Sequence, residues 1–158
     1  MSFASCWQSR ADAGFYHMQA AALTLKNEPE AILRMTEFVE NFGKNHGLSE
    51  WDILAFTLAI EELITNTIDY GYPGVPEGGA EIFLEMKKEG ERIYAVLRDS
   101  GLPFDPLARP EADLSGSLED KAIGGLGVHL VKKMMDHVAY ENCKGENILS
   151  MDRAAGPC

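Results

Sequence analysis

The clearest pattern of apolar residues in the chain lies between residues 53 and 67. Apolar side chains recur there at every third or fourth position, and this spacing predicts a helix with one face turned toward a core. The residues of this face are Ile53, Phe56, Ile60, Ile64 and Thr67. Ser49, with Asp52 three residues later, resembles a capping box and predicts the start of the helix. The turn at 71–74 predicts its end.

Two polar residues of this helix, Glu62 and Asn66, are separated by one helical turn. At positions i and i+4 their side chains project from the same side and can reach one ligand. Glu61 points about 100° away and cannot share the role of Glu62. We expect Glu62 and Asn66, with the small residues Ala55 and Ala59, on the side opposite the apolar face. Taken alone, such a pair is typical of a solvated helix surface.

Two further helices are predicted from the same kind of spacing. One begins near Asn27-Glu28-Pro29 and ends between Gly43 and Gly47, and its apolar face is formed by Ile32, Met35, Val39 and Phe42. The other opens at residues 124–127, and its apolar side is formed by Val128, Val131, Met135 and Val138.

Alternating apolar and polar residues predict the strands. Residues 80–87 and 92–98 alternate in this way, and the glycine-containing loop at 88–91 predicts a hairpin between them. Residues 137–142 and 147–152 predict a second hairpin, and residues 19–25 predict a first strand. Residues 103–123 are rich in proline and lack a sustained period, so we expect a loop or lid there.

This order of elements predicts the fold class. Strands that follow one another in hairpins, with helices between the hairpins, favour an α+β two-layer sandwich over a doubly wound fold. We expect one mixed, mostly antiparallel sheet that about three helices cover on one face. Residues 18–153 would form a single domain, preceded by a loose N-terminal extension (1–17) and followed by a C-terminal tail (154–158).

Composition restricts the partners. The 158 residues carry a formal net charge of −11, which disfavours nucleic acid or an anionic membrane as a partner but permits a nucleotide. No apolar run reaches the ~20 residues that a membrane span needs, and no leader-like segment opens the chain. The three cysteines have no metal-binding spacing. We therefore expect reduced thiols in a cytoplasmic protein.

Two segments add candidate chemistry. Asp99 ends a predicted strand, where it can accept a hydrogen bond from an exocyclic amine, and Gly101 lets a flat ring approach the backbone. The glycines of 124–127 open a helix whose free N–H groups suit a polyphosphate. Each segment alone is more often an ordinary turn or helix entry. The sequence contains neither the P-loop nor the dinucleotide fingerprint.

Together, these segments resemble the GHKL (Bergerat-fold) ATP-binding family, and most closely its bacterial anti-sigma-factor serine/threonine kinases. The resemblance covers about residues 19–153. The matching motifs are Glu62-x-x-x-Asn66, Asp99-x-Gly101-x-x-Phe104-Asp105 and Gly125-Leu126-Gly127. A closing turn, Gly145-x-Asn147, also agrees with the family, and we interpret it as structural.

The resemblance implies a role for each matched position. Asn66 would coordinate the Mg²⁺ that bridges the ATP phosphates. Asp99 would bind the adenine amino group, and Gly101 would clear space for the base. Glu62 would be the general base for the attacking hydroxyl. The remaining motif residues would line the cofactor; they are Phe104, Gly125, Leu126 and Gly127.

This sequence departs from the pattern of the family in two ways. Tyr70 occupies a position where close relatives often carry histidine, and its ring would pack beside the base or fill the core. The lid contains no cation certain to reach a γ-phosphate, and Arg109 and Lys121 are the candidates.

The resemblance also implies a function. The domain of residues 18–153 would be an ATP-binding kinase domain that phosphorylates a STAS-like anti-anti-sigma protein and binds a sigma factor, as a homodimer. The alternative is a nucleotide-gated protein-binding module with little or no kinase activity. The catalytic domain of a histidine kinase is disfavoured, because no dimerisation helix with a phospho-accepting histidine precedes residue 19.

Overall fold

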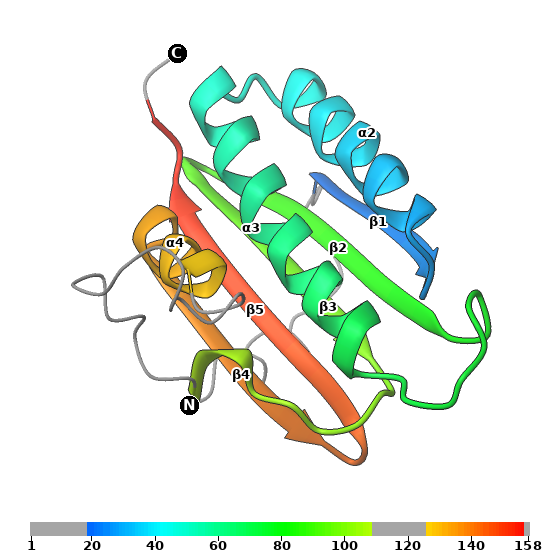
Figure 1. The fold of residues 1–158 in the computed structure, drawn as a ribbon. Helices are drawn as coiled ribbons and strands as arrows, with labels where there is room; N and C mark the ends of the chain where they lie inside the picture. The colour runs from blue at the N-terminus through cyan, green and yellow to red at the C-terminus, as the bar shows by residue number, and fades with distance from the viewer. Residues whose placement is uncertain (1–18, 109–125, 157–158) are drawn as a thin grey trace, which may run out of the picture.

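The computed structural model describes residues 19–108 and 126–156 as two layers, a five-stranded sheet and three helices on one of its faces (Figure 1). The helices are α2 (Glu30–Asn45), α3 (Glu50–Tyr70) and α4 (Leu126–Met134), with a short 3₁₀ helix η1 (Pro106–Ala108). The strands are β1 (Gln19–Lys26), β2 (Glu81–Glu89), β3 (Arg92–Asp99), β4 (His137–Cys143) and β5 (Glu146–Ala154). The predicted α+β two-layer sandwich is confirmed.

The strands follow the order β1-β2-β3-β5-β4, and every pair of neighbours is antiparallel. The mixed sheet that we expected therefore has no parallel pair among the described strands. Lys144 and Gly145 both have positive φ, as the tight turn between β4 and β5 requires. β5 lies between β3 and β4, so the last described strand is an interior strand of the sheet.

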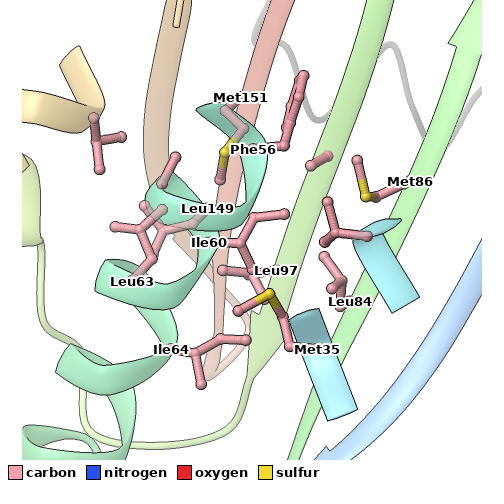
Figure 2. Packing of buried hydrophobic residues seen from close by; sticks show 14 of the residues in the cluster. Met35, Phe56, Ile60, Leu63, Ile64, Leu84, Met86, Leu97, Leu149 and Met151 are labelled. Atoms are coloured by element: carbon pink, nitrogen blue, oxygen red, sulfur yellow. The ribbon is translucent and has the colours of Figure 1, made fainter. Parts of the chain in front are cut away.

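The core lies between the helices and the sheet (Figure 2). Phe56, Ile60 and Ile64 of α3 are fully buried in one cluster with Leu84 of β2 and Leu97 of β3. These three residues confirm the predicted apolar face. The other buried side chains in this view include Met35, Leu63, Met86, Leu149 and Met151.

The opposite side of α3 is not a solvated surface. Ala55 and Ala59 are only 0% and 1% exposed, and Asn66 is 7% exposed. This side is buried because α4 packs against α3 there, while α2 packs along the other flank of the helix (Figure 1). The exposed positions of α3 include Trp51, Leu54 and Thr65 instead.

The third helix is shorter than its apolar pattern predicts. α4 ends at Met134, and Val138 belongs to β4 rather than to the apolar side of the helix. Asp136, which follows the helix, donates its N–H to the carbonyl oxygen of Asp152 in β5. The chain is therefore held in the sheet two residues after α4 ends.

Several predictions concern residues outside the described ranges. They are the extension at 1–17, the end of the tail (157–158), and the part of the predicted lid from 109 onward, which includes Arg109 and Lys121. Cys143 is an exposed free thiol. In the described ranges, no helix combines the length and apolar character that crossing a bilayer requires.

Replacement of Ile60 by alanine tests the core. Ile60 is fully buried between α3 and the sheet, so removing its side chain should lower the free energy of unfolding by about 2–5 kcal/mol. Leu33→Ala is the control, because Leu33 is 66% exposed on α2 and its loss should change stability by about 0.5 kcal/mol or less. Urea denaturation measures both. Equal losses in the two variants would contradict this packing.

Candidate functional site

A pocket opens where the C-terminal half of α3 faces the ends of β3 and β5. Its lining includes the apolar residues Leu63 and Phe104, and the polar side chains that line it include Asn66, Asp99 and Asn147. A small number of polar groups that converge in an apolar pocket is typical of a small-molecule site. The structure thus brings together Asn66 and Asp99, which are 33 residues apart in the sequence.

Asp99 stands at the end of β3 and is 7% exposed. Its Oδ1 accepts hydrogen bonds from the Gly101 N–H (2.8 Å), the Asn147 amide (3.0 Å) and the Tyr72 hydroxyl (3.4 Å). In the described part of the chain, all hydrogen bonds of this carboxylate use Oδ1. Its Oδ2 therefore remains an acceptor for a ligand.

Asn147 is a site residue that the sequence analysis assigned to structure alone. It is 5% exposed, and its amide group donates to Asp99 and to the carbonyl oxygens of Gly101 and Leu102 (both 3.2 Å). Its Oδ1 accepts from the Tyr140 hydroxyl at 2.8 Å. The register of the sheet reveals the role of Asn147, because this residue is the direct partner of Asp99 on the neighbouring strand.

Gly101 has a structural reason to be glycine. A Cβ at this position would lie 2.6 Å from the carbonyl oxygen of Gly71 and 2.9 Å from Asp99 Oδ1. That same carbonyl accepts the Leu102 N–H at 2.7 Å. The close contact between the end of α3 and the loop after β3 thus excludes any side chain at residue 101, before a ligand is considered.

Tyr72 fixes the other side of Asp99. Its single hydroxyl proton is shared between Asp99 and the Glu81 carbonyl oxygen (3.2 Å), and its oxygen accepts the Ser100 N–H (3.1 Å). Burial and the negative charge of Asp99 raise the pKa of Tyr72 to about 12. Tyr72 therefore remains a neutral hydrogen-bond donor to Asp99 at physiological pH.

Glu62 and Asn66 contact each other directly. The Asn66 Nδ2 donates to the backbone carbonyl oxygen of Glu62 at 2.8 Å and to its carboxylate Oε1 at 2.9 Å. Because both partners are acceptors, the nitrogen of the amide must face Glu62, and Asn66 Oδ1 is left for another partner. An amide oxygen of this kind suits a hard divalent cation.

Gly127 lies against Glu62. A Cβ at Gly127 would overlap the Glu62 carboxyl group, so a side chain at this position would force that carboxylate to move. The N–H groups of the first turn of a helix have no partner within the helix, and they carry the positive end of its dipole. The carboxylate of Glu62 therefore lies beside a site that also suits other anions.

The remaining predicted residues lie around these groups. The Phe104 ring contacts the Tyr70 ring, with 5.9 Å between their centroids. Tyr70 is 47% exposed, so it does not fill the core. Leu126 is the first residue of α4, and Gly125 lies outside the described ranges.

The sequence and this fold define a family. Residues 25–153 match the family described as the histidine kinase-like ATPase domain, and this chain belongs to it. The resemblance to the GHKL family is thereby confirmed.

Known protein kinases are similar to this chain. The serine-protein kinase RsbW of Halalkalibacterium halodurans is 30% identical over 124 residues, which cover 76% of this chain and 73% of that protein. The serine/threonine-protein kinase BtrW of Bordetella bronchiseptica is 28% identical over 102 residues, or 64% of this chain and 70% of that protein.

A solved structure confirms the fold. The structure of the RsbU and RsbW domains of Rv1364c from Mycobacterium tuberculosis superposes with a TM-score of 0.60 at 15% sequence identity. The match covers 87% of this chain but 33% of that longer chain. At this identity the likeness concerns the fold alone.

The high pKa of Tyr72 predicts a late step in an absorbance titration. Its neutral form is favoured by folding, so the stability that this adds is present below pH 10 and is lost as pH rises from about 10 to 12. We expect tyrosine absorbance at 295 nm to show a component near pH 12 that Tyr72→Phe lacks. An unchanged titration in Tyr72→Phe would show that another group is responsible.

Proposed function

We propose that this protein is an ATP-dependent serine/threonine protein kinase of the anti-sigma-factor type. The observation that carries the proposal is the contact of Glu62 with Asn66 and Gly127. These contacts place the Glu62 carboxylate between the Asn66 amide, which can bind a metal, and the N-terminus of α4, which can bind phosphate. Such a carboxylate has no purpose in a site that only binds a nucleotide.

The adenine end of the nucleotide would lie at Asp99. Its Oδ2 would accept a hydrogen bond from the adenine amino group, while Gly101, Tyr72 and Asn147 hold the carboxylate by Oδ1. Phe104 lines the same pocket and would contact the base. An acceptor at this position selects adenine over guanine, because guanine presents an oxygen at the corresponding atom.

The phosphate end would lie between α3 and the start of α4. Asn66 Oδ1 would be a ligand of Mg²⁺, and the backbone N–H groups at Leu126 and Gly127, together with Gly125 just before them, would contact the phosphates. When bound, Mg·ATP supplies the γ-phosphoryl group that is transferred. The residues of this chain orient that group toward Glu62.

Glu62 would be the general base. This role requires an ionised carboxylate within hydrogen-bond reach of the attacking hydroxyl. The Asn66 amide fixes Oε1 of Glu62 at 2.9 Å, and a groove beside the carboxylate, lined by Leu58, Gly127 and Leu130, leaves room for an acceptor. The proton of a serine or threonine hydroxyl would pass to Glu62 as the phosphoryl group is transferred.

The proposed acceptor is a STAS-like anti-anti-sigma protein, and the second partner is a sigma factor. The support is the resemblance to the anti-sigma kinases, together with the similarity to proteins named serine-protein kinases. Phosphorylation adds negative charge to the acceptor, and the net charge of −11 on this chain would weaken the complex by repulsion. A homodimer and a cytoplasmic location remain predictions.

Asp99→Asn tests the adenine site. The new amide must keep its oxygen toward the three donors at Oδ1, so its NH₂ group replaces the acceptor Oδ2. The affinity for ATP should fall at least about tenfold. The ratio of the ATP affinity to the GTP affinity should fall by more than this, because the new NH₂ group can donate to the guanine oxygen.

Calorimetric titration with each nucleotide measures this change. Asp69→Asn, at an exposed position near the end of α3, is the matched control and should bind both nucleotides as the wild type does. If Asp99→Asn keeps the nucleotide preference of the wild type, Asp99 does not contact the base.

Glu62→Gln tests the base. The glutamine oxygen can still accept the Asn66 hydrogen bond, so ATP binding should be retained, but phosphate transfer to the cognate STAS protein should fall by about 10²-fold or more. Formation of phosphoserine in the presence of Mg·ATP is the measurement. Glu50→Gln is the control, because Glu50 is exposed in the first turn of the same helix, away from the groove.

Two results would change the proposal. An undiminished rate in Glu62→Gln would remove Glu62 from its role as the base. Tight binding of ATP by the wild type, without transfer to the cognate STAS protein, would instead favour a nucleotide-gated binding module.

A further inference from the structure

The strongest unexplained feature outside the pocket is a buried charge pair at the other end of α3. Asp52 is 0% exposed, and its carboxylate accepts hydrogen bonds from the Arg153 Nε (2.9 Å), the Ser49 hydroxyl (2.7 Å) and the Gly156 N–H (2.9 Å). The initiation of α3 does not require this arrangement, because the Ser49 hydroxyl already caps the Asp52 N–H.

The surroundings keep this pair charged. Burial by itself raises the pKa of Asp52, but the hydrogen bonds from Ser49, Gly156 and Arg153, with the charge of the arginine, hold that pKa below its usual value. The guanidinium group also lies over the ring of Trp51, with 5.9 Å to its centroid. A buried pair with this many partners fixes the relative positions of the elements that supply them.

A second nitrogen of the Arg153 guanidinium group contacts α4. Its Nη1 donates to the carbonyl oxygen of Met134 at 2.7 Å, and Met134 is the last residue of that helix. The carbonyl groups at the end of a helix have no partner within it, and a cation there complements the helix dipole. Arg153 therefore joins the C-terminal end of α4 to the N-terminal end of α3 through β5.

The other end of α4 is Gly127, against Glu62. The helix is rigid and rises ~1.5 Å per residue, so a shift at Met134 is carried to Gly127, ~10 Å away along its axis. Gly127 lies so close to Glu62 that even a Cβ there would overlap the carboxyl group, so a shift of the helix would also move that carboxylate.

We propose that Arg153, held by Asp52, is a positioning residue that sets α4 in place, so that the glycine end of the helix lies correctly against Glu62 and the phosphates. This inference rests on the proposed function for its effect on catalysis. The part that concerns the position of α4 depends only on the contacts described above.

Arg153→Lys is the informative variant. A lysine can keep the charge beside Asp52, but its single nitrogen cannot replace both Nε at Asp52 and Nη1 at Met134. Arg34→Lys is the matched control, because Arg34 also donates to a backbone carbonyl oxygen, that of Thr24, on the α2 side of the molecule. Asp52→Asn is a second variant that weakens the same network from the other partner.

Hydrogen exchange of the α4 amides in the protein without nucleotide is the first measurement. We expect exchange at residues 128–134 to be at least about fivefold faster in Arg153→Lys and Asp52→Asn, with α2 unchanged, and to be unaffected in Arg34→Lys. Equal exchange of α4 in Arg153→Lys and the wild type would overturn the proposal. So would a uniform increase over the whole chain, because that result indicates a general loss of stability.

The second measurement compares ATP with adenosine, which lacks the phosphates. Arg153→Lys should bind ATP about tenfold more weakly and adenosine as tightly as the wild type, and its kcat for phosphate transfer should fall. Equal losses for both ligands would overturn the positioning role. Failure of the wild type to bind ATP would refute the proposed function instead, and the exchange of α4 would still decide the structural part.

Discussion

The pairing of β3 with β5 is the constraint on which the rest of this structure depends. Its register sets Asn147 opposite Asp99, and these two side chains meet by a hydrogen bond inside the pocket. The same strand carries Arg153 at its far end, where it reaches Asp52 and the last carbonyl of α4. One strand therefore fixes both the pocket and the helix that begins against Glu62. A shift of this strand by one residue would turn all these side chains to the other face of the sheet.

α3 serves the core and the site at once. Its apolar residues pack on the sheet, and its second buried side, closed by α4, presents Asn66 and the small residues Ala55 and Ala59. Small side chains let two helices approach closely, and this closeness brings Gly127 to the carboxylate of Glu62. The geometry of the candidate base is thus a consequence of helix packing. The groups that hold it are an amide on its own helix and a glycine on the next.

Much of this could be predicted from the sequence. Apolar periodicity predicted the strands and helices, and the motif spacing predicted the family, because both depend on neighbours along the chain. Periodicity did not show that α4 buries the second side of α3, since the pattern of one helix does not name its partners. It also missed Asn147 and Arg153. Their importance arises from β5 lying between β3 and β4, and strand order depends on contacts between distant segments.

The position of β5 inside the sheet also has a consequence for folding. β4 and β5 are joined by a tight turn and can pair locally, but β5 must also pair with β3, whose partner residues lie 48 to 62 positions earlier in the chain. Such distant pairing is slow, because a long loop must close before the contacts form. During synthesis, β5 is the last of the described strands to emerge. A nascent chain that already contains α2, α3 and β1 to β3 therefore lacks a completed sheet, and the pocket lined by Asn66, Asp99 and Asn147 is complete only with that final strand.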